Sequence, residues 1–188
     1  MNCLEIKNKV KQIIDNNGSP PSIVSNNRSL QNDLGGKKFL DLSDEKQRMI
    51  YGDITILNEK AFRYYLFEMI QNTLERKELP PLFDIFLLGL SKRSMSFDNR
   101  LKQLSKEEKQ IVLEFLECIL QYIITSRNDD AIFLREDFLQ DIKEIIDFWR
   151  LRKIKGSGEN YNPNLNPKCN FTSKKILSKF SYEAFKFS

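Results

Sequence analysis

The stretch 57–70, LNEKAFRYYLFEMI, is the part of this sequence that most constrains the fold. Its apolar residues recur at helical spacing and cover more than half of a helix circumference, which places such a helix inside a bundle. Asn58 is the predicted N-cap, because its side-chain oxygen can accept a hydrogen bond from a free amide of the first turn. The apolar positions are Ala61, Phe62, Tyr65, Leu66, Met69, Ile70 and Leu74. We therefore expect the other segments to pack around this helix.

Five further segments carry helical patterns, and the sequence therefore predicts an all-α fold. Ser105 and Glu108 match a capping box, in which a hydroxyl and a carboxylate three residues later satisfy each other's amides. Only 7 Gly and 6 Pro in 188 residues argue against a turn-rich β fold. The expected helices cover 2–16, 44–51, 59–76, 82–90, 106–125 and 129–155, with loops at 17–38 and 91–99 and an extended stretch at 38–41.

Residues 1–155 are thus predicted to form one bundle of about five to six helices, and residues 156–188 a linker with a short basic amphipathic segment. Residues 150–188 hold nine Lys or Arg against two acidic residues, so this end of the chain is basic while the body is mildly acidic. Lys174, Lys175 and Lys179 lie among aromatic residues, a pattern typical of nucleic-acid contact. A membrane-surface helix or a segment packed on the bundle would show the same pattern.

The sequence contains few of the residues and motifs that enzymes commonly use for catalysis. It has no His, so Ser–His–Asp and Cys–His mechanisms lack their base, although a Ser–Lys or carboxylate mechanism stays open. Cys3, Cys118 and Cys169 are far apart, which argues against a zinc site and favours reduced thiols, with Cys118 in a helix core. We expect no cofactor and no metal. With neither a signal peptide nor a membrane span evident, we expect a cytoplasmic protein that is not an enzyme.

Three groups of residues are candidates for binding. The predicted last helix carries Glu136, Asp137, Asp141 and Glu144, an acidic face that could meet a basic partner or the chain's own tail. Arg63 and Tyr64 on the central helix could form a ligand-facing patch or an internal network that orients helices, since a buried Tyr needs a partner and Arg can fork onto a carboxylate. The stretch 35–38, GGKK, is either a tight turn or a weak anion site.

Part of the chain resembles a family of small all-helical bacterial proteins of unassigned function. The resemblance covers about residues 33–120 and follows the order Gly35-Gly36-Lys37-Lys38-Phe39, Ala61-Phe62-Arg63-Tyr64-Tyr65-Leu66, Ser96-Phe97-Asp98-Asn99-Arg100-Leu101 and Leu104-Ser105-Lys106-Glu107-Glu108. The run 61–66 is its most specific part, and Phe67 stands where the family often has Pro. The resemblance implies an all-helical fold and carries no catalytic residues.

The sequence thus favours a cytosolic protein-binding module, of the kind that neutralises a partner toxin or effector as immunity proteins and antitoxins do. The acidic last helix and the scarcity of catalytic groups are the observations behind this hypothesis. The alternative is a nucleic-acid-associated protein that binds through its basic tail.

Overall fold

The structure is a computed structural model that describes residues 3–25, 28–52, 54–76, 79–80, 82–91, 95–127 and 129–154. By their contacts, Met1–Gly158 form one unit and Glu159–Ser188 another, and all described residues belong to the first. Every regular element within the described ranges is helical, so the predicted all-α class is confirmed. The expected basic tail segment lies outside the described residues.

Eight α-helices and two short 3-10 helices make up the described part of the chain. They are α1 Cys3–Asn17, α2 Arg28–Leu34, η1 Phe39–Asp41, α3 Asp44–Gly52, η2 Ile54–Ile56, α4 Glu59–Glu75, α5 Phe83–Gly89, α6 Met95–Lys102, α7 Lys106–Thr125 and α8 Asp129–Ile154. The predicted count of five to six was too low, because α2 and α6 lie where the sequence predicts loops. Of residues 38–41, which the sequence predicts to be extended, Lys38 has extended backbone angles, whereas Phe39–Asp41 form η1. Short polar helices of this kind are stabilised by packing more than by their own pattern.

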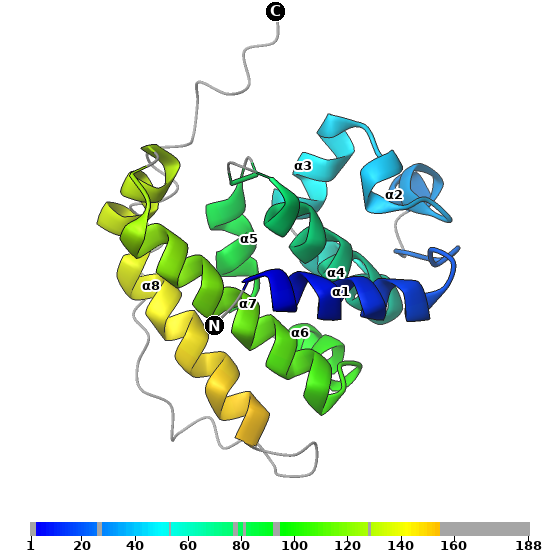
Figure 1. The fold of residues 1–188 in the computed structure, drawn as a ribbon. Coiled ribbons are helices and arrows are strands. Elements are labelled where there is room, and N and C mark those ends of the chain that lie inside the picture. The colour runs from blue at the N-terminus through cyan, green and yellow to red at the C-terminus, as the bar shows by residue number, and fades with distance from the viewer. Residues whose placement is uncertain are drawn as a thin grey trace, which may run out of the picture. The chain divides into compact units, whose positions relative to one another are not determined.

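Helix α4 is the centre of the bundle, as the sequence predicts. From Ala61 to Ile70 every side chain except that of Arg63 is buried. Helices α1 and α6 and the short helix η1 pack against it (Figure 1). Asn58 is its N-cap, and the Asn58 Oδ1 atom accepts a hydrogen bond from the Ala61 amide at 2.9 Å. The local capping signal and the broad apolar face therefore act together to place this helix.

Helices α7 and α8 lie side by side and form the longest helix pair (Figure 1). The capping box at the start of α7 is present, with Ser105 and Glu108 satisfying each other's amides. Arg135 of α8 donates a hydrogen bond to the carbonyl of Ile124, in the last turn of α7, at 2.9 Å. Trp149 of α8 is fully buried, and its indole N–H donates to the carbonyl of Leu90 at 3.1 Å. These two bonds fix α8 near both ends.

A disulfide joins Cys3 of α1 to Cys118 of α7, with 6.2 Å between their Cα atoms. The prediction that these two cysteines are reduced thiols was therefore wrong, whereas the predicted burial of Cys118 in a helix core is confirmed at 7% exposure. The two residues stand 115 positions apart, so only the packing of α1 on α7 brings them together. Cys169 lies outside the described residues.

Candidate functional site

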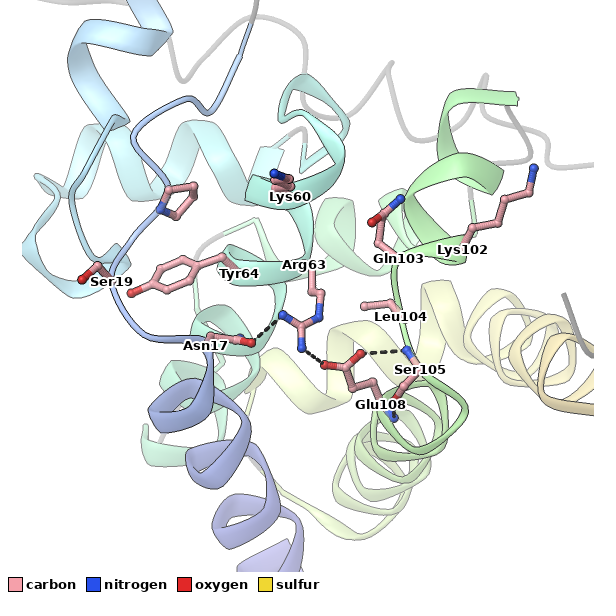
Figure 2. A pocket seen from close by; sticks show the side chains of 11 residues that line it. Asn17, Ser19, Lys60, Arg63, Tyr64, Lys102, Gln103, Leu104, Ser105 and Glu108 are labelled. Carbon is pink, nitrogen blue, oxygen red and sulfur yellow. Dashed lines mark hydrogen bonds and ion pairs between the residues drawn. The ribbon is translucent and has the colours of Figure 1, made fainter.

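Arg63 occupies a polar junction where α4 meets the end of α1 and the start of α7. Its Nη1 atom donates to Asn17 Oδ1 at 2.5 Å, and its Nη2 atom donates to Glu108 Oε1 at 2.5 Å. The other carboxylate oxygen of Glu108 accepts from the Ser105 amide at 2.8 Å. Figure 2 shows Asn17, Arg63, Glu108 and Ser105 linked in this order by hydrogen bonds. Arg63 therefore orients three helices, which is the internal-network interpretation weighed from the sequence.

An open hollow of about 620 Å³ lies against this junction, and we call it the Lys60 hollow. Four segments that are distant in the sequence line it: residues 17–21, residues 60–64 of α4, the turn 102–105, and Glu108 of α7 (Figure 2). Its charged lining consists of Lys60, Arg63 and Lys102 against the single carboxylate of Glu108. The hollow is therefore polar and carries a net positive charge.

A second hollow of about 380 Å³ shares Asn17, Arg63, Ser105 and Glu108 with the first. The shared residues are those of the Arg63 junction, so the bonded chain separates the two hollows. The side chain of Glu108 is 7% exposed and that of Arg63 is 36% exposed. The Arg63 side chain is thus partly exposed to solvent, while its carboxylate partner is covered.

Tyr64, the other candidate on α4, lies in a buried network beside the junction. Its hydroxyl donates to Glu68 at 3.0 Å, and Glu68 also accepts from the Phe39 amide at 2.5 Å. Burial raises the pKa of the Tyr64 hydroxyl, so this group stays neutral. Burial also raises the pKa of Glu68, although the two donated bonds work in the opposite direction. The network attaches η1 to α4.

The stretch 35–38 is a tight turn, and its amides serve the fold. The Gly35 amide donates to Gln31, the Gly36 amide to Pro21 and the Lys37 amide to Leu34. Gly36 has φ of +73°, a conformation that favours glycine. The Tyr65 hydroxyl lies 2.9 Å from the carbonyl oxygen of Leu34 and 2.8 Å from that of Lys37. With these amides already engaged, the structure supports the tight-turn interpretation over an anion cradle.

The acidic candidates on α8 lie on the side of the helix opposite its buried residues or at its margin. Glu136 is exposed, Asp141 and Glu144 are half-buried, and the side chain of Asp137 lies outside the described residues. Burial, with a smaller contribution from Glu144, raises the pKa of Asp141. Among the described residues, no hydrogen bond or ion pair joins these acids to Arg63 or Tyr64. The two sets of candidates therefore form separate surfaces.

Two apolar side chains are exposed at the corner between α7 and α8. Ile124 is 44% exposed and Phe133 is 37% exposed. Both residues belong to helices whose other apolar side chains are mostly buried. The close turn between the helices, held by the bond from Arg135 to the Ile124 carbonyl, leaves the corner uncovered. Glu136 follows Phe133 by one helical turn, so this corner combines apolar and acidic side chains.

Residues of the motifs named in the sequence analysis make contacts between helices. Arg63 bonds to Glu108, the Phe39 amide donates to Glu68, and Arg100 donates to the carbonyl of Leu57 at 2.7 Å. These contacts hold α4 to the helices and loops around it.

Comparison with known proteins finds no matching family model, no matching curated protein and no matching solved structure. The described residues contain no group of three or more Cys, Asp or Glu placed to hold a metal ion. Within the same ranges, no helix has the length and apolar character needed to cross a bilayer. Lys174, Lys175 and Lys179 lie outside the described residues, so nucleic-acid binding through them stays a prediction.

The sequence did not indicate Asn17, Lys60 or Lys102 as members of a site. Asn17 ends a helix, and the two lysines resemble ordinary solvated residues in the sequence. They become neighbours only because α1, α4 and the turn before α7 converge. No local signal could have grouped them.

Proposed function

We propose that this protein is a non-enzymatic protein-binding module that neutralises a partner protein, as immunity proteins and antitoxins do. The observation that supports this proposal is the α7–α8 corner, where exposed Ile124 and Phe133 adjoin acidic residues of α8. An exposed aromatic side chain beside charged groups is typical of a protein interface, because aromatic anchors supply much of the binding energy and charges select the partner.

The docking surface comprises Ile124, Phe133, Glu136, Asp141 and Glu144. Its acidic residues fit a partner that presents a basic segment. Helices α7 and α8 hold these residues in fixed positions, because Arg135 attaches α8 to the end of α7 and Trp149 attaches it to Leu90, just after α5. A rigid surface loses little conformational freedom on binding, which favours affinity. The partner's apolar groups would cover Phe133 and Ile124.

A site-specific photo-crosslinker tests this proposal in the native cells. Placed at Glu136, it should give one dominant protein adduct, whereas the same group at exposed Glu45 of α3 should not. The purified adduct partner should then bind the unmodified chain, and Glu136→Lys with Glu144→Lys should weaken that binding at least about tenfold. The proposal would be contradicted by equal adducts from Glu136 and Glu45. It would also be contradicted if binding is unchanged when the charges of Glu136 and Glu144 are both reversed.

The neutralising role predicts a genetic relationship as well. Loss of this protein should impair growth only while the partner is produced, and deletion of both genes should restore growth. The Glu136→Lys, Glu144→Lys variant should behave like the deletion, while Glu45→Lys should behave like the wild type. Growth that is unaffected by deletion in partner-producing cells would exclude neutralisation even if the two proteins bind.

The proposal places the protein in the cytoplasm, where thiols are generally kept reduced. The Cys3–Cys118 bond is the feature that argues for an oxidising compartment. Trapping free thiols in intact cells before lysis distinguishes the two locations: Cys3 and Cys118 should be alkylated in a cytoplasmic protein and protected in an oxidising one.

A further inference from the structure

The Lys60 hollow has no role in the proposed docking surface of α8, and its chemistry points to a different ligand. Its lining includes the polar side chains of Asn17, Ser19, Gln103 and Ser105 beside the charged groups. A hollow of about 620 Å³ has the volume of a small-molecule site rather than of a protein interface.

The charges around the hollow favour an anion. Lys60 has no acidic partner within hydrogen-bond or ion-pair distance among the described residues, and the Lys102 ammonium contacts only the Asn99 side-chain oxygen, at 3.3 Å. Arg63 is the third cation: its two terminal nitrogens bond to Asn17 and Glu108, and its side chain remains 36% exposed. Three cations against one carboxylate give the lining a net positive charge that a bound oxyanion would offset.

Two long helices begin at the hollow, which adds to the positive field. Lys60 lies in the first turn of α4, a helix of 17 residues, and Ser105 is the N-cap of α7, a helix of 20 residues. The positive end of a helix dipole favours negative charge close to its first turn. Side-chain groups cap both starts, Glu108 at α7 and Asn58 at α4.

One buried hydrogen-bond donor lacks a partner at this place. The Asn17 side chain accepts from Arg63 through Oδ1, while its Nδ2 atom is buried and has no hydrogen-bond partner among the described residues. A buried donor without an acceptor is costly, and native structures rarely keep one without a role. Asn17 lines the hollow beside Arg63, so a bound oxyanion would lie close to this unsatisfied amide.

We infer that the Lys60 hollow binds a small ligand through an oxyanion group, either a phosphate or a carboxylate. The anion sits between the ammonium of Lys60 and the Arg63 guanidinium, beside Asn17. Lys102 lies at the rim, where its flexible side chain extends outward (Figure 2) and can turn toward a bound anion. The rest of the ligand occupies the polar space toward Gln103 and Ser19.

Titration with two probes tests the inference on the full chain. Inorganic phosphate and succinate are added separately at matched ionic strength, with sodium chloride as the reference, while NMR follows the Asn17 side-chain amide and the Arg63 Nε–H. We expect one probe or both to shift these signals in a saturable way at millimolar concentration, beyond the effect of chloride. Phosphate alone indicates a phosphorylated ligand, and succinate alone indicates a carboxylate ligand.

The variants separate a built site from general attraction to a basic protein. Lys60→Gln should weaken probe binding about tenfold, since it removes one charge-assisted hydrogen bond, and adding Lys102→Gln should weaken it further. Lys143→Gln removes an exposed lysine of α8 and should leave binding unchanged. The inference is overturned if neither probe moves the two signals more than chloride does, or if Lys143→Gln weakens binding as much as Lys60→Gln.

Discussion

The bond between Arg63 and Glu108 provides the sharpest test of how the helices are held. The change is a double-mutant cycle with Arg63→Met, which keeps an apolar stem of similar length, and Glu108→Gln, which removes the charge with little change in volume. A glutamine has one acceptor oxygen, so it can serve either Arg63 or the Ser105 amide but not both. The cycle isolates the part of the stability that depends on both residues together.

The expected coupling follows from how exposed each partner is. Hydrogen bonds to charged groups contribute about 1.5–3 kcal/mol, whereas fully exposed ion pairs contribute about 0.2–1 kcal/mol. The Glu108 side chain is 7% exposed but that of Arg63 is 36% exposed, so we expect the contribution of this pair to lie between these two ranges. We expect a coupling free energy of about 1–1.5 kcal/mol after discounting for solvent screening at Arg63.

Urea unfolding of the four proteins, with the disulfide intact, measures the coupling. The Arg150–Glu117 pair provides a matched control at 2.8 Å, because its side chains are 52% and 30% exposed. Its own cycle should give about 0.5 kcal/mol or less. If the Arg63 cycle gives no more than the Arg150 cycle, burial of Glu108 does not strengthen the pair and the reasoning is wrong.

Three further predictions concern stability, each measured by urea unfolding. Tyr65→Phe should lower the free energy of unfolding by about 1–2 kcal/mol, because buried carbonyls of the Gly35–Gly36 turn lose their donor; an unchanged value would contradict this. Because burial raises the folded-state pKa of Glu68, the wild type should lose stability relative to Glu68→Gln as pH rises from about 4.3, the ordinary glutamate pKa. A difference that stays constant with pH would refute this. Cys3→Ser should cost about 4 kcal/mol, given the separation of 115 residues, and reductant should have no further effect on the variant.

The elements with local signals were predictable from the sequence. Asn58 and the Ser105–Glu108 box mark helix starts through bonds that span three residues, and both are present in the structure. Helix α2 was not predictable, because its seven residues are mostly polar and it depends on burial of Leu34. The exposure of Ile124 and Phe133 was not predictable either, because helical spacing identifies the apolar face of a helix but not which part of that face a neighbouring element covers.

The candidate sites depend on contacts that no local pattern encodes. Arg63 and Glu108 are 45 residues apart, and the sequence indicated only that such an arginine can fork onto some carboxylate. The sequence also did not indicate the disulfide partner of Cys3, because three cysteines in separate segments do not show which two lie close together. The Lys60 hollow needs four segments to converge, so it became visible only once α1, α4 and α7 were placed.

The Cys3–Cys118 bond also determines how the molecule responds to mechanical force. When both ends are pulled, the tension passes from Cys3 directly to Cys118, and the chain between them cannot lengthen. Only residues 119–188 then add contour length, and α8 is peeled away while α1 to α6 stay within a covalent loop. Single-molecule stretching should therefore show one short extension in oxidising buffer and a much longer one after reduction.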